Sequence, residues 1–206
     1  MKVILVIGSP HKEGCTYTAL TEIANTLNEY DIETEIFWIG NKPISGCIGC
    51  GACINTGKCC IDDTVNTFVQ MAENADGFVF GSPVHYAAAS GAITSFLDRA
   101  FYGKSAKFAL KPAAAVVSCR RGGASAAFDQ LNKYFTISQM IVVGSQYWNQ
   151  IHGNTPEEAL CDEEGLQTMR TLGHNMSWLL KSIESGKKAG IIIPEKETPV
   201  KTNFIR

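Results

Sequence analysis

The sequence has little charge and almost no charge imbalance. Of its 206 residues 18% are charged, and 18 basic against 20 acidic side chains leave a formal net charge of −2. A protein that binds nucleic acid normally carries a basic surplus or a basic stripe, so the composition argues against a nucleic-acid partner. With 45% hydrophobic residues, the chain is also too apolar to be disordered.

Long apolar runs are missing as well. No uninterrupted apolar stretch approaches the roughly 18 residues of a membrane span. The apolar start at 3–7 is too short for the core of a signal peptide and runs directly into Gly8-Ser9-Pro10. We therefore predict a cytoplasmic protein without a membrane partner.

Cysteine is the residue type in excess. Five of the eight cysteines lie between positions 47 and 60, whereas a disulfide scaffold would spread them through a small, loop-rich chain. Because the rest of the chain has an ordinary core pattern, the cluster predicts metal or redox chemistry in a reducing compartment. We expect one domain over 1–206, with a cysteine-rich insertion at 45–61 and a C-terminal tail at 186–206.

Short apolar runs alternate with longer amphipathic segments along the chain. The alternation is the signature of a doubly wound, three-layer α/β/α sheet, which we predict to have five parallel strands in the order 2-1-3-4-5. Asp62 is the expected cap of the second helix, and Thr155 before Pro156 is a strong start signal for the last one. The predicted strands are 3–7, 32–39, 77–81, 113–117 and 140–143, and the predicted helices are 16–30, 62–75, 91–101, 124–134 and 155 to about 183.

Ligands of such sheets bind beyond the carboxyl ends of the strands, where three loops should meet. The first loop, 8–16, combines glycines and hydroxyl residues with a helix start, so its backbone amides can bind an anion. It has neither a Gly-Lys-Ser/Thr ending nor a Gly-x-Gly-x-x-Gly turn, which favours a monophosphate; a plain strand-to-helix turn is the alternative. The predicted binding residues are Ser9, His11, Lys12, Gly14, Cys15 and Thr16.

The second and third loops, 81–91 and 118–123, offer backbone donors beside small residues and suit a flat ring. An arginine in the third loop would stabilise an electron-rich ring once it is reduced. The alternatives are a structural role for His85 and a solvated turn for one of the two arginines. The residues predicted to frame the ring are Pro83, Val84, His85, Tyr86, Ser118, Arg120, Arg121, Gly122 and Gly123.

Several of these segments resemble the NADPH-dependent FMN reductase family over nearly the whole chain. They are Gly8-Ser9-Pro10, the run 81–86, Phe96-Leu97-Asp98-Arg99 and the glycine pair 122–123. The resemblance implies a flavodoxin-like fold, FMN as cofactor, NAD(P)H as co-substrate, and a homodimer or homotetramer with the flavin near a subunit interface. The family usually has arginine where this chain has His11 and commonly asparagine where it has Cys15, so Lys12 or backbone amides would compensate the phosphate charge.

The cysteine spacing resembles that of the iron–sulfur flavoproteins. Two gaps of two residues and one of five separate Cys47, Cys50, Cys53 and Cys59, which the resemblance makes the ligands of a [4Fe–4S] cluster, with Cys60 as a spare. A four-thiolate zinc site, a redox-active dithiol and an empty motif are the alternatives.

Together these features predict an FMN-dependent NAD(P)H oxidoreductase that passes electrons to an unidentified acceptor, through the cluster where one is bound. The flavin carries the chemistry, so no catalytic acid or base is expected from the protein. The alternative is a non-enzymatic FMN electron carrier or redox sensor whose cysteine motif is empty or binds zinc. Cys119 and Cys161 are expected to be small core residues. Tyr147 and Trp148 are expected to cover the flavin or a dimer seam, with packing in the core as the alternative.

Overall fold

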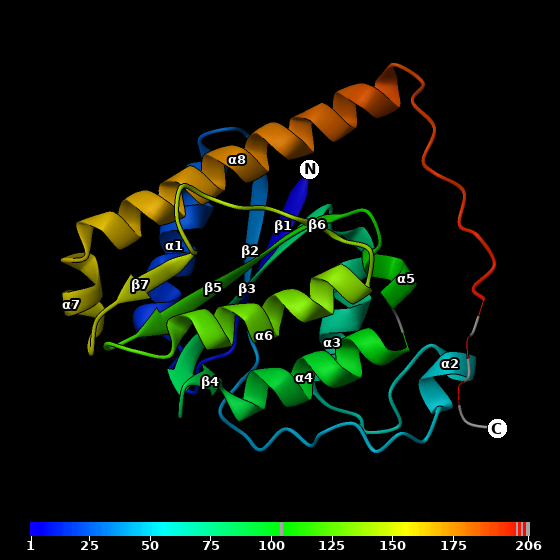
Figure 1. The fold of residues 1–206 in the computed structure, drawn as a ribbon, viewed down its shortest axis with the longest axis horizontal. Coiled ribbons are helices and arrows are strands. Elements are labelled where there is room, and N and C mark those ends of the chain that lie inside the picture. The colour runs from blue at the N-terminus through cyan, green and yellow to red at the C-terminus, as the bar shows by residue number, and fades with distance from the viewer. Residues whose placement is uncertain (104, 201, 203, 205–206) are drawn as a thin grey trace.

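The computed structural model describes residues 1–103, 105–200, 202 and 204, so part of the predicted tail at 186–206 lies outside the described residues. A twisted sheet has helices on both faces (Figure 1). Its strands are β1 (Lys2–Ile7), β2 (Glu33–Trp38), β3 (Gly77–His85), β4 (Ala88–Ala89), β5 (Pro112–Cys119), β6 (Ile141–Val142) and β7 (Gln150–His152). The helices are α1 (Cys15–Asn28), α2 (Ala52–Thr56), α3 (Thr64–Met71), the 3₁₀ turn η1 (Ala72–Asn74), α4 (Gly91–Tyr102), α5 (Ser105–Phe108), α6 (Ala124–Ile137), α7 (Pro156–Leu160) and α8 (Glu163–Lys188).

The parallel path through the sheet is β2-β1-β3-β5-β6, which confirms the predicted order 2-1-3-4-5. The predicted number of five strands is wrong, because the sheet has seven. The predicted strand 140–143 corresponds to β6 alone, and β7 is an additional strand; the two pair with opposite ends of β5. The chain leaves the edge after Val143 and returns at Asn149, whose side-chain amide donates to the Ala115 carbonyl oxygen at 3.0 Å. In addition, β3 continues past Gly81 and pairs with β4 as an antiparallel hairpin.

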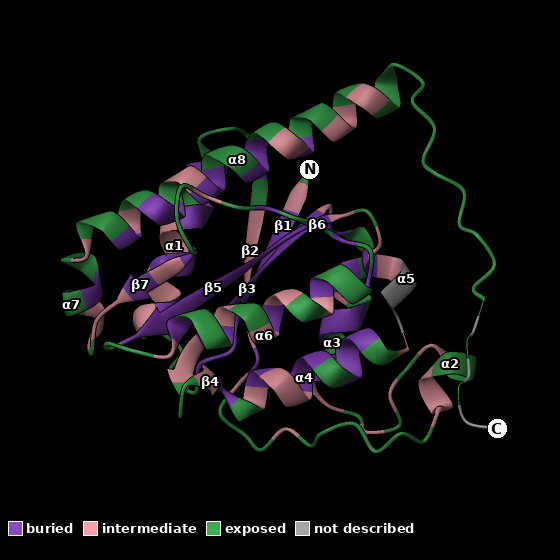
Figure 2. Ribbon diagram, in the orientation of Figure 1, coloured by how far each residue is buried: buried purple, intermediate pink, exposed green. Residues whose placement is uncertain are grey.

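Apolar side chains fill both faces of the sheet. On one face, phenylalanines of β3 pack against α3, α4 and α6; on the other, alternate residues of β1 pack against α1 and α8. The residues of β5 are buried along the whole strand, as expected for a central strand covered on both sides (Figure 2). This packing fixes where the strands end, and therefore where the loops at their carboxyl ends lie.

The segment predicted as one last helix forms two helices, α7 and α8, because a second N-terminal cap lies within it. The Oγ1 atom of Thr155 accepts from the Glu158 amide at 3.3 Å, which confirms the predicted start of α7. Asp162 then caps α8, its Oδ1 accepting from the Gly165 amide at 2.9 Å. Cys161 falls at the break and is exposed, so its predicted place in the core is wrong, whereas Cys119 is buried as predicted.

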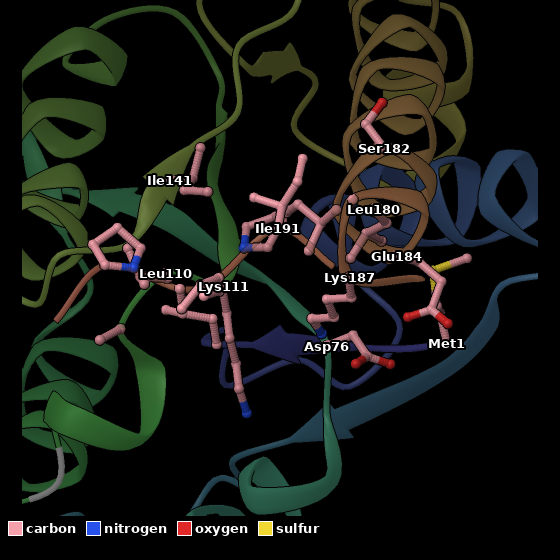
Figure 3. Close-up of a pocket in the computed structure, with 17 residues that line it drawn as sticks. Met1, Asp76, Leu110, Lys111, Ile141, Leu180, Ser182, Glu184, Lys187 and Ile191 are labelled. Atoms are coloured by element: carbon pink, nitrogen blue, oxygen red, sulfur yellow. The ribbon is translucent and has the colours of Figure 1, made fainter. Parts of the chain in front are cut away.

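A cavity of about 510 Å³ lies at the amino ends of the strands, between α8 and the start of the tail (Figure 3). Lys111, Leu180 and Ile191 contribute to its lining. The tail leaves its helix at Gly190 and is exposed over 191–200, including 87% of Ile192. Among the described residues, no helix combines the length and apolarity needed to cross a bilayer.

Candidate functional site

The three loops predicted from the sequence meet at the carboxyl edge of the sheet, opposite the cavity. The Gly8 amide donates to the Gly81 carbonyl oxygen at 2.8 Å, which joins the ends of β1 and β3. The Ser90 hydroxyl donates to the Gly8 carbonyl oxygen at 2.7 Å. The hydroxyl oxygens of Thr16 and Ser118 lie 2.8 Å apart in the interior and connect the first loop to the third. One hydrogen-bonded frame therefore holds all three segments.

The first loop ends in helix amides that no side chain among the described residues caps. Gly14 stands at the N-cap of α1 and has no side chain to offer. Ser9 is buried and fixes the loop: its Oγ accepts from the His11 amide at 3.1 Å, and its carbonyl oxygen accepts from Trp38 Nε1 at 2.9 Å. The loop is thus rigid, while the first-turn amides and the positive end of the helix dipole are suited to an anion.

The predicted phosphate-binding side chains in this loop have different surroundings. His11 and Lys12 are exposed, so both are available to a charged ligand. The Cys15 thiol instead contacts the Gly153 carbonyl oxygen at 3.6 Å, and burial raises the pKa of this thiol. Cys15 therefore offers an anion its backbone amide, not its side chain.

The second loop is a tight hairpin with a strained tip. His85 pairs with Ala88, so Tyr86 and Ala87 form the turn, with φ of 50° and 59°. Positive φ at both central positions is the pattern of a type I′ turn, which glycine and asparagine normally occupy. The Tyr86 side chain is fully exposed at the tip. Strain of this kind persists where the surrounding structure holds it and concentrates at ligand sites.

Gly123 of the third loop holds that hairpin in place. Its φ is +89°, and a Cβ atom here would lie 2.6 Å from the Ala87 Cα. Gly122 differs, because a Cβ atom there would meet nothing within 4 Å. Arg120 and Arg121 are both exposed beside the glycines.

The Thr16–Ser118 contact predicts a measurable coupling between the first and third loops. We expect Thr16→Val to lower the free energy of unfolding by about 1–3 kcal/mol, because it leaves the Ser118 hydroxyl buried without a partner. The double variant Thr16→Val/Ser118→Ala removes both polar groups and should recover most of the loss. Urea denaturation under reducing conditions measures both; a double variant less stable than the single one would contradict the pairing.

The clustered cysteines line one pocket at the far end of α4 from the hairpin. Gly49 and Gly51 have φ of 66° and 72° and turn the backbone between successive thiols. The Cys53 side chain lies directly against Gly103, where no Cβ would fit. Among the described residues, no three His, Cys, Asp or Glu side chains are grouped to hold a single metal ion. The pocket is lined by Cys47, Cys50, Cys53, Cys59 and Cys60 together with Ile48, Gly51, Ile61, Arg99 and Tyr102.

Arg99 organises this pocket, a role not predicted from the sequence. Its side chain is 0% exposed, and each of its N–H groups has a partner. Nε donates to Cys59 Sγ at 3.2 Å, and the two terminal nitrogens donate to the Asp63 carboxylate at 2.6 and 2.8 Å. Those nitrogens also donate to the carbonyl oxygens of Ile61 at 2.8 Å and Ser45 at 3.4 Å. One guanidinium therefore fixes both ends of the cysteine loop, which we define as residues 45–61.

Asp63 and Asn66 complete the support of Cys59. Asp63, not the predicted Asp62, caps α3, because its Oδ1 accepts from the Val65 amide at 3.0 Å. Asn66 accepts from the Cys59 amide at 2.8 Å and donates to its carbonyl oxygen at 3.0 Å. Burial alone would lower the pKa of Arg99, but its bonds to the Asp63 carboxylate and Cys59 raise it above its usual value.

Cys60 has a different environment from its neighbour. Its Sγ lies 3.4 Å from the Sγ of Cys50, and both side chains are exposed. The backbone amide of Ala52 lowers the pKa of Cys50, whereas the hydrogen bond with Cys50 raises the pKa of Cys60.

The donor set fits an iron–sulfur cluster. Thiolates are the ligands of such clusters, and hydrogen bonds to the ligand sulfur atoms tune the reduction potential of the cluster. Arg99 donates a hydrogen bond of this kind to the Cys59 sulfur. The uncapped α1 amides, the hairpin and Gly123 fit a monophosphate with a flat ring. Tyr147 and Trp148 are each 51% exposed, so the alternative that they pack in the core is wrong.

Comparison with known proteins places these features in context. Residues 1–155 match the family described as NADPH-dependent FMN reductase. The chain is 34% identical over 192 residues to an iron–sulfur flavoprotein of Methanocaldococcus jannaschii, covering 89% of this chain and 100% of that protein.

Solved structures with little sequence identity share the fold. A flavodoxin from the domain Archaea is 16% identical, with a TM-score of 0.60 over 88% of this chain and 99% of that one. A flavoenzyme NAD(P)H:(acceptor) oxidoreductase from Paracoccus denitrificans is 18% identical, with a TM-score of 0.64 over 88% of this chain and 97% of that one. The predicted flavodoxin-like fold is confirmed.

Proposed function

The chain belongs to the NADPH-dependent FMN reductase family, within its iron–sulfur flavoprotein branch, and on this premise we propose that it is an FMN-dependent oxidoreductase using NAD(P)H. The observation that carries the proposal is the frame at the carboxyl edge. There, the Gly8–Gly81 and Thr16–Ser118 contacts hold an uncapped helix start beside a strained hairpin.

In this proposal the first loop binds the FMN phosphate. The first-turn amides of α1 donate to the phosphate oxygens, and the helix dipole favours the negative charge. Ser9 keeps the loop in shape through its bonds to His11 and Trp38, and exposed Lys12 supplies a positive charge in the place of the family's usual arginine. Gly14, Cys15 and Thr16 contribute through the backbone at the helix start.

The second and third loops frame the flavin ring. Pro83 to Tyr86 and Ser118 to Gly123 would frame the ring, and Arg120 or Arg121 would compensate its charge after reduction. FMN, when bound, would supply the redox chemistry between the nicotinamide and the acceptor. The protein positions the ring and needs no acid or base of its own.

The cysteine loop is proposed to bind a [4Fe–4S] cluster through Cys47, Cys50, Cys53 and Cys59. Such a cluster supplies one-electron transfer. Arg99 holds Cys59 in the pocket and donates a hydrogen bond to its sulfur, and Asn66 fixes the Cys59 backbone. With the cluster bound, electrons leave singly; without it, a quinone, free flavin or another small two-electron acceptor is favoured.

The proposal is tested on protein purified without oxygen. We expect about one FMN per chain, roughly four irons with matching acid-labile sulfide, and oxidation of NADH or NADPH when an acceptor is added. The name of the family and that of the Paracoccus flavoenzyme support a nicotinamide as the electron donor.

Each other outcome overturns a defined part. FMN-loaded protein that oxidises neither nicotinamide is an electron carrier or redox sensor, not a reductase. Colourless protein that binds no added FMN contradicts the flavin site itself. Zinc without sulfide contradicts the cluster and leaves the flavin site standing.

A further inference from the structure

We propose that Cys50 and Cys60 form a disulfide when the cysteine loop is free of metal and a small-molecule disulfide is present as the oxidant, so that the adjacent residues Cys59 and Cys60 have separate roles. Cys59 stays a free thiol that can bind metal, and Cys60 is the residue that forms the disulfide with Cys50. This inference goes beyond the proposed function, because it concerns the metal-free protein and does not depend on what the loaded protein reduces.

The first argument is the distance between the two sulfur atoms. They lie 3.4 Å apart, and a disulfide bond is about 2.05 Å long, so rotation of the two side chains closes the gap without a change of fold. Cys50 sits between Gly49 and Gly51, both of which have positive φ values. Both thiols are exposed and accessible to a small oxidant.

The second argument is that Cys59 is unavailable for this pairing. Its sulfur accepts from the buried Nε of Arg99 at 3.2 Å, and Asn66 holds its backbone on both sides. Rotating Cys59 toward Cys50 would leave an Arg99 donor buried without an acceptor, which costs free energy. Of the two neighbouring thiols, only Cys60 is therefore free to react with Cys50.

The chemistry balances with a small-molecule disulfide, such as oxidised glutathione, as the oxidant. One thiolate of the pair attacks the oxidant, forms a mixed disulfide and releases one glutathione thiol. The second thiolate attacks the protein sulfur of that mixed disulfide and releases the second glutathione thiol. Two protein thiols are oxidised and one disulfide is reduced. Because Cys50 in a disulfide has no thiolate to offer, the bond and the cluster exclude each other.

Peptide mapping tests the pairing directly. Metal-free protein, reduced and then treated with oxidised glutathione, is alkylated, digested with trypsin and analysed by mass spectrometry without reduction. Lys58 separates Cys50 from Cys60, so cleavage there leaves two peptides joined only through a disulfide. We expect the joined pair in the wild type and in Cys59→Ser, and its loss both in Cys60→Ser and in Cys50→Ser; the Cys50 variant is needed because Cys15, Cys47 and Cys53 lie on the same peptide as Cys50.

Iron loading separates the two roles with the same variants. After reconstitution with iron and sulfide, Cys60→Ser should bind as much iron as the wild type, whereas Cys59→Ser should lose most of it. Flavin content and circular dichroism confirm that each variant is folded. A joined pair that persists in Cys60→Ser, or none in the wild type, overturns the inference. If no variant binds iron, the cluster proposal fails while the mapping result still decides the disulfide.

Discussion

Replacing Arg99 with methionine is expected to lower the free energy of unfolding of the metal-free protein by about 3 kcal/mol and to abolish iron binding. Removing one partner of a buried ion pair costs about 3–5 kcal/mol, because the other charge stays behind without compensation. Asp63 is 27% exposed, so water reaches it and the lower end of that range applies. The substitution also removes the guanidinium that donates hydrogen bonds to Cys59, Ile61 and Ser45. Urea denaturation and iron analysis measure the two effects.

Asp63→Asn provides the matched control for this prediction. Asparagine caps a helix as well as aspartate does, so the start of α3 is retained while the charge is removed. In the double variant Arg99→Met/Asp63→Asn no charge is stranded, and the loss should be clearly smaller than the sum of the single losses. Losses that simply add would contradict a coupled pair. Arg99→Lys should fail to restore iron binding, because a single ammonium cannot reproduce the fork that reaches Cys59 and Asp63 together.

Gly123→Ala is expected to weaken FMN binding by tenfold or more. An added Cβ would lie 2.6 Å from the Ala87 Cα, which is backbone and cannot rotate away. The left-handed conformation at φ +89° adds about 1–2 kcal/mol for a residue with a side chain, and forced contact adds about 1–3 kcal/mol. The hairpin must move away from the third loop, and about 1.4 kcal/mol of lost binding energy already corresponds to tenfold.

Gly122→Ala serves as the control for the same loop. It adds an identical methyl group one residue earlier, where nothing lies within 4 Å and φ is not in the left-handed region. Its free energy of unfolding, measured by urea denaturation of the cofactor-free protein, should equal that of the wild type, whereas Gly123→Ala should be less stable. The FMN dissociation constant of Gly123→Ala is measured by fluorescence quenching on the cofactor-free protein, and wild-type affinity would show that the hairpin contact does not shape the flavin site.

Much of the fold could be predicted because strand order follows from apolar runs. Val3 to Ile7 and Gly77 to Gly81 are continuous apolar or glycine segments that only a doubly covered sheet accommodates. The extra strands could not be predicted in the same way. The hairpin depends on a turn at Tyr86–Ala87 without a glycine or asparagine signal, and the additional strand β7 depends on a tertiary contact, the Asn149 side chain on Ala115.

At the candidate site, residue types could be predicted but not their pairings. The cysteine spacing shows a cluster of ligands, yet nothing in it separates Cys59 from Cys60, because their difference comes from Arg99, 40 residues further along. A signal for Arg99 was present: it lies at helical spacing from Ile93 and Phe96, on the buried side of α4. Adjacent Asp62 and Asp63 look alike in sequence, and only the guanidinium and the Val65 amide distinguish them.

The length of α4 sets the separation between the two proposed redox centres. The helix starts at its cap Ser90, whose hydroxyl holds Gly8 in the flavin frame, and ends beside the thiol pocket at Gly103. Its 12 residues span about 18 Å at a rise of about 1.5 Å per residue. Because α4 packs against the phenylalanine core, its position and length are fixed. Within one chain, the proposed flavin frame and the thiol pocket therefore lie at opposite ends of α4, and movements of the loops do not change the length of the helix between them.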